Sequence, residues 1–286
     1  MSTTRSEIES LVFLMDDPDE FIRESVYKRI FELGESSVPL LDELRAKSKD
    51  EKQKAELKKI IHQITYESFQ QEFISLLENG IYTMDDLEEG VFMLSRFDNP
   101  TIRTRQFKVM LDGMAAELEP RILRAGSLVD KMQIVLQFMY GQLGFEGCHS
   151  DYLNPRHSYL HHVIPNRIGI PLSLAMVLLF LARRLRLPFY GVNMPLHFLV
   201  KFETEGGKSL FIDPFNHGGI LSREQCLLFL KKSGVKPSDA YFDRASEIEM
   251  LSRFMRNLIN GYQQLKEEQL SNDLSKLLSL LESSRL

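Results

Sequence analysis

The sequence predicts an α+β protein that is mainly helical, with one small antiparallel sheet. Apolar residues recur at helical spacing through most of the 286 residues. The run Leu172–Ala182 is apolar except for Ser173, which is typical of a helix buried on all sides. Two short β-prone segments, 197–202 and 209–212, flank Gly206-Gly207, which is a hairpin signal. The strands therefore form a small sheet within a helical protein.

Composition excludes several classes of protein. Hydrophobic residues make up 43% of the chain and charged residues 26%, as in globular rather than disordered proteins. The net charge of -5 argues against a nucleic-acid partner. The run Leu172–Ala182 is too short for a membrane span, which needs about 20 residues, so we expect no membrane partner.

The cysteine count indicates a reducing compartment. Cys148 and Cys226 are the two cysteines, and they lie far apart. This pattern excludes a disulfide framework and a Cys-rich zinc site, and no motif calls for a cofactor. The start MSTTRSEIES is polar and is not a signal peptide, so we expect a cytoplasmic protein without a cofactor.

Residues 1–66 read as helices. Asp17-Pro18-Asp19-Glu20 is a helix start, and Gly34 ends the apolar face that follows. The segment from Asp16 to Leu44, DDPDEFIRESVYKRIFELGESSVPLLDEL, resembles one HEAT repeat. A solenoid needs three or more repeats, so this segment is expected to be either a helical cap on the next domain or a small docking surface.

Residues 67–146 are also predicted to be helical, and the segment 145–167 that follows is rich in histidine. His157 and His161 are four residues apart, so on one helix they would face the same side, as metal ligands can. Together with His149 they give the hypothesis of a metal-dependent enzyme. The glutamate of a HExxH site is absent, because Ser158 follows His157, so no metal ligand is assigned.

The unit from Arg167 to Gly219 carries the candidate chemistry. A buried helix from Pro171 to Leu187 precedes the strand that His197 begins and the strand that Asp213 ends. These two positions fall side by side in an antiparallel hairpin, where a carboxylate can orient the imidazole. Ser173, at the start of the helix, is either a nucleophile or a helix cap.

Other polar residues of this unit receive lesser roles. Arg167, Asn193 and His217 lie near enough in sequence to line the same binding site. The group Arg183, Arg184, Arg186 is expected to be a solvated last helical turn, favoured by the helix dipole.

Several short motifs in order resemble the SirB-type branch of the transglutaminase-like superfamily, over about residues 68–225. They are Gly144-Phe145, Tyr152, Asn154-Pro155, Ser158-Tyr159-Leu160, 167–174 (RIGIPLSL), 195–198 (PLHF) and 211–215 (FIDPF). The resemblance implies a papain-like core in which His197 and Asp213 match the catalytic histidine and aspartate. The family's cysteine position falls on Pro171, which has no nucleophilic atom. Ser173 lies two residues on, about 200° around the helix.

The tail, residues 241–286, is predicted to be a helical hairpin. RNLINGYQQLKEEQLSNDLSKLLSL looks like one TPR-like unit, of the kind SirB-type proteins often carry. The predicted organisation is therefore a HEAT-like segment at 1–66, a transglutaminase-like domain at 67–240 and a TPR-like hairpin at 241–286.

Three functions compete. The first is a non-catalytic, regulatory module, or pseudoenzyme, that binds a protein or peptide. The second is a serine-type amidase or peptidase that uses Ser173, His197 and Asp213. The third is the metal-dependent enzyme that uses His149, His157 and His161.

Overall fold

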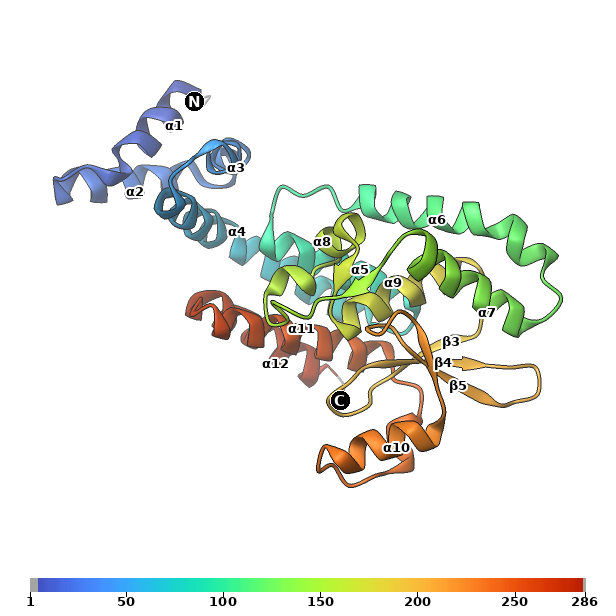
Figure 1. Cartoon of the computed structure of the whole chain (residues 1–286). Coiled ribbons are helices and arrows are strands. Elements are labelled where there is room, and N and C mark those ends of the chain that lie inside the picture. The colour runs from blue at the N-terminus through green and yellow to red at the C-terminus, as the bar shows by residue number, and fades with distance from the viewer. Residues whose placement is uncertain (1–4, 285–286) are drawn as a thin grey trace. The chain divides into compact units, whose positions relative to one another are not determined.

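The computed structural model describes residues 5–284 (Figure 1). Residues 1–4, part of the polar start, lie outside the described residues. Contacts divide the chain into two compact units. The first runs up to Ser75 and includes Ser95–Arg103, and the second comprises Leu76–Leu94 and the chain from Thr104 onward. The predicted domain boundary after residue 66 falls inside one continuous helix, α4 (Glu51–Asn79).

The first unit is helical. Its elements are α1 (Arg5–Phe13), η1 (Leu14–Asp16), α2 (Glu20–Leu33), η2 (Gly34–Ser37), α3 (Val38–Lys47) and most of α4. Asp19 caps α2 by accepting from Phe21 N–H, as the Asp-Pro-Asp start predicts, and Gly34 ends that helix with a positive φ of 59°. Ile30, Leu41 and Leu57 are fully buried in a core that α2, α3 and α4 share.

The second unit holds the remaining helices and both sheets. Its helices are α5 (Met84–Asp98, whose last turn belongs to the first unit), α6 (Arg105–Arg124), α7 (Leu128–Leu136), η3 (Gln137–Gln142), η4 (Pro155–His157), α8 (Leu160–Asn166), α9 (Pro171–Arg184), α10 (Arg223–Lys232), η5 (Asp239–Phe242), α11 (Glu247–Gln264) and α12 (Glu268–Ser283). A mainly helical α+β fold is confirmed.

The main sheet is antiparallel, with the order β3-β4-β5-β6, and forms as a meander. Its strands are β3 (Phe189–Val192), β4 (Leu199–Glu203), β5 (Ser209–Asp213) and β6 (Gly219–Leu221). The predicted hairpin joins β4 to β5, with Val200 opposite Ile212, and Gly207 supplies the positive φ of its turn. A smaller parallel pair joins β1 (Glu146–Gly147) to β2 (Ile168–Gly169).

Helix α9 is the core of the second unit. Each residue from Pro171 to Ala182 is buried, as the apolar run predicts. The helix packs against α6 on one side and against β3 and β4 on another, and Figure 1 shows it enclosed between α6 and the strands. Within the described chain, no helix is long and apolar enough to cross a membrane.

The C-terminal hairpin packs α11 against α12 and belongs to the second unit. Ser246 and Glu249 form a capping box at the start of α11. Gly261 lets α11 approach the chain before η4, because a Cβ there would lie 2.6 Å from the Leu153 carbonyl oxygen. The helix therefore supports residues 151–155 as well as the end of β3.

The expectation that the arginines after the apolar run are solvated was wrong for two of them. Arg183 donates to Glu88 over 2.9 Å, and Arg184 donates to Glu88 over 2.6 Å and to Asp112 over 2.7 Å. Glu88 is 3% exposed, so α5 and the end of α9 share a buried ion-pair network. The acidic start of α5 supplies a partner that helix-dipole reasoning on α9 alone did not include.

We predict that Glu88→Gln destabilises the protein. The change leaves two partly buried guanidinium groups without their shared carboxylate, and it should cost about 3 kcal/mol of unfolding free energy, the low end for a broken buried pair. Urea unfolding followed by circular dichroism measures this loss. Glu89→Gln is the matched control, because Glu89 is exposed and its ion pair with Lys108 is worth less than about 1 kcal/mol. Equal losses in the two variants would contradict the buried network.

Candidate functional site

A histidine and an aspartate meet where β4 and β5 lie side by side. Nε2 of His197 lies 2.8 Å from Oδ1 of Asp213. Asp213 is the last residue of β5, and His197 lies two residues before β4, so the antiparallel pairing of the strands brings them together. Nδ1 of His197 has no hydrogen-bond partner among residues 5–284 and is the nitrogen left for chemistry or for a ligand.

The strand that His197 was expected to begin starts later, at Leu199. Residues 195–197 instead form a turn, in which Leu196 has a positive φ of 67° and an exposed side chain. A non-glycine residue in that region is strained, so the turn is held by its surroundings. The turn directs the imidazole toward Asp213 and leaves Leu196 at the surface.

Asp213 is buried and collects several donors. Besides His197, its carboxylate accepts from Phe215 N–H at 3.0 Å, from Asn216 N–H at 3.2 Å and from the Asn216 side-chain amide at 2.6 Å. Burial acts to raise the pKa of Asp213, but the hydrogen bonds from His197 and Asn216 outweigh it, so that pKa lies below its usual value. The carboxylate is therefore ionised at neutral pH and able to support a protonated imidazole.

A cluster of aromatic side chains lies beside His197. The ring centroid of Phe215 lies 6.3 Å from that of His197, 4.7 Å from that of His149 and 6.0 Å from that of Tyr152. Phe229 of α10 approaches from another direction, with its centroid 6.2 Å from His197. These rings give the imidazole a largely apolar surrounding.

Arg253 of α11 holds the segment that precedes His197. One terminal nitrogen, Nη1, donates to the Asn193 side-chain oxygen and, over 2.8 Å, to the Met194 carbonyl oxygen. The guanidinium also lies 5.5 Å from the ring of Phe198, the residue after His197. Sequence reasoning missed Arg253, because it is remote in sequence and its neighbours predict only a packed helix.

Ser173 does not lie where a nucleophile would. It is fully buried, and its Oγ donates to the His157 carbonyl oxygen at 2.6 Å and accepts from Ile170 N–H at 3.0 Å. Ile170 is the N-cap residue of α9, and its N–H is shared between Ser173 Oγ and the His157 carbonyl oxygen, 3.2 Å away. In the described chain, no hydrogen bond joins Ser173 to His197.

Cys226 does not carry an activated thiol. Cys148 and Cys226 are both free and both buried. Burial, and secondly the charge of Asp213, raise the pKa of Cys226 to about 11. A reactive thiol needs the opposite shift, so Cys226 is a packing residue.

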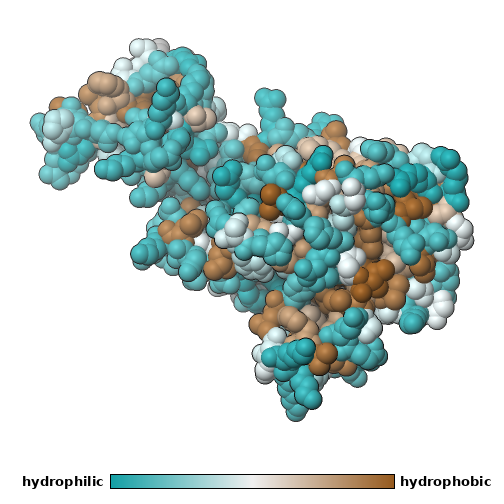
Figure 2. Space-filling model, viewed as in Figure 1, coloured by the Kyte–Doolittle hydropathy of each residue, from teal (hydrophilic) through white to brown (hydrophobic). Residues whose placement is uncertain are grey.

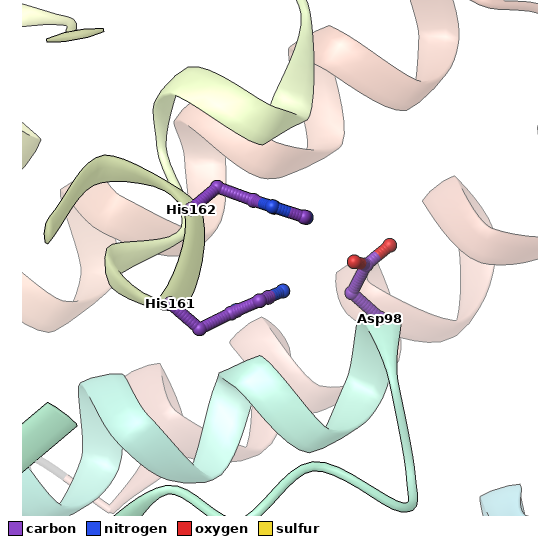
Figure 3. A group of neighbouring side chains, drawn as sticks. All are labelled: Asp98, His161 and His162. Atoms are coloured by element: carbon purple, nitrogen blue, oxygen red, sulfur yellow. The ribbon is translucent and has the colours of Figure 1, made fainter. Parts of the chain in front are cut away.

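The histidines proposed as metal ligands are not brought together. His157 ends η4, whereas His161 belongs to α8, so they do not share one helix. His161 lies instead beside His162, with ring centroids 4.1 Å apart, as Figure 3 shows. Asp98, also labelled there, belongs to the first unit. Within residues 5–284, no group of three ligand atoms lying within 4.8 Å of one another includes His149 or His157.

The three predicted binding residues have different surroundings. Arg167 is exposed, has a positive φ of 63° and donates to the Leu143 carbonyl oxygen, which ties α8 to the end of η3. Asn193 accepts from Arg253. His217 is exposed and lines a surface cavity of about 840 Å³ beside η3. Among the three, only Asn193 belongs to the segment that leads to His197 and is held there by Arg253.

Tyr140 is a further polar residue near Asp213. It lies in η3, a π-helical turn, and such turns are frequent at functional sites. Its ring lines the same cavity as His217, yet its hydroxyl is enclosed and has no partner among the described residues. Burial, and secondly the charge of Asp213, raise the pKa of Tyr140. The hydroxyl therefore stays protonated.

Comparison with known proteins agrees with this fold. Residues 105–256 match the transglutaminase-like superfamily. A UPF0162 protein from Xylella fastidiosa (strain 9a5c) is 31% identical over 196 residues, covering 65% of this chain and 69% of that protein. A UPF0162 protein from Vibrio cholerae is 28% identical, covering 48% and 51%. F-box only protein 21 from Homo sapiens is 28% identical, covering 69% of this chain and 36% of that protein. No solved structure matches.

The match covers more than half of the chain and includes the main sheet, α9 and the His197–Asp213 pair. The chain belongs to the transglutaminase-like superfamily. Its membership confirms the superfamily that the motifs indicate.

We predict that Asp213→Asn lowers the free energy of unfolding and makes it depend less on pH between pH 7 and 3. The folded pKa of Asp213 is depressed, so the ionised carboxylate stabilises the fold above about pH 4 and this stability is lost as the pH falls through the folded pKa. The variant should lose about 1.5–3 kcal/mol at pH 7 and less at pH 3. Urea unfolding from pH 7 to 3 tests this, with Asp239→Asn, whose side chain is 86% exposed, as the control. An equal loss of unfolding free energy at every pH would contradict a depressed pKa for Asp213 in the folded protein.

We predict that Tyr140→Phe leaves stability within about 1 kcal/mol of the wild type, or raises it. The substitution removes a buried hydroxyl that bonds to no described residue. Tyr262→Phe is the matched control, because the Tyr262 hydroxyl lies 3.0 Å from that of Tyr159, and its removal should cost about 1 kcal/mol. Thermal unfolding compares the two, and a larger loss for Tyr140→Phe would show that its hydroxyl has a partner in solution.

Proposed function

We propose that this transglutaminase-like protein is a non-catalytic, regulatory module that binds a protein or peptide on the surface around His197. The observation that carries this proposal is the position of the Ser173 hydroxyl, which is buried and bonded to His157 and Ile170. Pro171, at the position of the family's cysteine, has no nucleophilic atom. The histidine and aspartate of the superfamily are thus retained without a nucleophile at the helix start.

Exposed apolar residues near His197 support a binding role. Leu196 is 62% exposed and precedes the imidazole, and Phe229, which contacts it, is 42% exposed. Leu228, next to Phe229 in α10, and Ile220, on the strand that pairs with β5, are also about half exposed. Figure 2 shows hydrophobic residues among hydrophilic ones over the strands and α10. Apolar side chains next to hydrogen-bonding groups are what a bound peptide chain requires.

The finer classification is part of the same proposal. The motifs from residue 144 to residue 215 support the SirB-type branch, and the flanking helices support HEAT-like and TPR-like additions. Two cysteines that are both free support a cytoplasmic location.

A serine-type amidase is the second candidate, and the retained His197–Asp213 hydrogen bond favours it. The Asp213 carboxylate holds Nε2, which leaves Nδ1 to act as a base. This candidate requires the start of α9 to rearrange, because Ser173 must give up its bonds to His157 and Ile170 and turn toward His197. The loss of these two hydrogen bonds opposes that change, although Ile170 N–H keeps its bond to the His157 carbonyl oxygen.

We predict that a serine-directed fluorophosphonate does not label Ser173 between pH 6 and 9. The hydroxyl is fully buried and its proton is donated to a carbonyl oxygen, so no base can remove it. Mass spectrometry of the intact chain detects labelling, with Ser173→Ala as the control. Labelling that Ser173→Ala abolishes would establish the amidase and overturn the non-catalytic proposal.

The binding half of the proposal is tested with a random peptide library displayed on phage and panned against the full chain. Selected peptides should bind about tenfold more weakly to Leu196→Asp, because an apolar contact of one leucine is lost. Leu123→Asp, at a leucine of α6 that is 78% exposed, should leave affinity unchanged. Failure to select any peptide, or equal effects of the two variants, would contradict binding at His197.

A further inference from the structure

Arg253 is a partly buried cation with no carboxylate partner among residues 5–284. By contrast, Arg256, one turn further along α11, pairs with the carboxylate of Glu282. Burying a charge without an opposite charge is costly, and the cost shows as a pKa for Arg253 that burial, and secondly nearby Arg256, hold below its usual value.

The contacts of Arg253 leave one particular edge of its guanidinium unused. Both contacts to the chain before His197, with the Asn193 side chain and the Met194 carbonyl, come from Nη1, which has two protons. Nε and Nη2 have no partner among the described residues and are not among the enclosed polar atoms. Together, Nε and Nη2 form the edge that binds both oxygens of a carboxylate.

Tyr152 carries a further hydroxyl donor, on the segment that packs against α11. The residues around it are held against α11 where Gly261 meets the Leu153 carbonyl. Burial raises the pKa of the Tyr152 hydroxyl, and the nearby charge of Arg253 lowers it, so the two groups are electrostatic neighbours. The Tyr152 hydroxyl has no hydrogen-bond partner in the described chain, and its ring packs on Phe215, which packs on His197.

We propose that Arg253 and Tyr152 form a binding site for a carboxylate, on the surface that also carries His197. The guanidinium edge donates to the two carboxylate oxygens, and the Tyr152 hydroxyl donates to one of them. The biological ligand of this site follows from the proposed function. It is a peptide that brings either its C-terminal carboxylate or an acidic side chain to Arg253. The cation is in place before the ligand arrives, since Asn193, Met194 and Phe198 hold the guanidinium.

The first test uses small probes and does not depend on peptide binding. N-acetylglycine, N-acetylglycinamide and inorganic phosphate are titrated into the full chain at constant ionic strength, and the Asn193 side-chain amide is followed by NMR. We expect a saturable shift with N-acetylglycine and none with its amide. No saturable shift with N-acetylglycine, or an equal shift with its amide, overturns the proposal. Saturation by phosphate alone assigns the site to a different ligand class and overturns it too.

Variants separate recognition from folding. Arg253→Lys keeps the charge but lacks the planar edge, so it should weaken N-acetylglycine binding about tenfold or more. Tyr152→Phe removes only a hydroxyl from a residue that is 43% exposed and should weaken binding severalfold with no change in thermal unfolding. Arg256→Gln, the matched control on the same helix, should have no effect. Unchanged binding in Tyr152→Phe and in Arg253→Lys contradicts the site.

The peptide arm compares each selected peptide with its C-terminally amidated form and with forms whose acidic side chains are replaced by amides. Loss of binding in either form supports the carboxylate site and identifies the source of the carboxylate. Full binding by peptides without any carboxylate overturns this site while leaving the proposed function intact. If N-acetylglycine binds saturably but no peptide can be selected, the carboxylate site is supported and the proposed peptide-binding function is contradicted.

Discussion

The carboxylate of Asp213 is buried at the end of β5, and the neighbouring structure is arranged to satisfy it. An unpaired charge there would cost several kcal/mol, so the chain supplies four donor groups. Three come from the turn after the strand, through the N–H groups of Phe215 and Asn216 and the side-chain amide of Asn216. One comes from His197 on the neighbouring segment. The same bonds that make the burial tolerable fix the turn, the imidazole and the ring of Phe215 beside it.

The start of α9 shows the opposite arrangement, because its polar groups are used within the scaffold. A proline at the first helical position has no N–H to satisfy, which suits a helix N-terminus. Ser173, two residues later, bonds the N–H of Ile170 and the carbonyl of His157, and so joins η4 to α9. In a nucleophilic enzyme this position would have to hold a reactive atom facing the imidazole. Here the Ser173 hydroxyl bonds to Ile170 and His157 and not to the imidazole.

The sequence predicts those parts of the site that depend on local periodicity. Two β-prone segments that flank Gly206-Gly207 predict a hairpin, and antiparallel geometry then places His197 beside Asp213. The exact start of β4 was not predictable, because it depends on the positive φ of Leu196, which its surroundings impose. Phe215 and Tyr152 both stand in the motifs that indicated the superfamily, although nothing in the sequence shows that their rings meet.

Arg253 and Glu88 could not be predicted, and for a common physical reason. Each side chain lies on a helix whose pattern explains only its own apolar face, and each partner comes from another part of the chain. Glu88 lies near the acidic start of α5, and Arg183 and Arg184 were expected to form a solvated last helical turn. Only tertiary packing shows that they neutralise one another. Sequence patterns report the period of an element, whereas the pairing of buried charges depends on how elements meet.

The two charged groups at the ends of the segment 193–198 have different consequences for a ligand. Asp213 binds the His197 end and is fully compensated, so it attracts no additional cation. Arg253 binds the Asn193 end through neutral oxygens, so its positive charge remains uncompensated. Between them, Leu196 presents an apolar side chain to solvent. The peptide that we propose as a ligand therefore has an apolar residue followed by a carboxylate, because this order of groups complements Leu196 and Arg253.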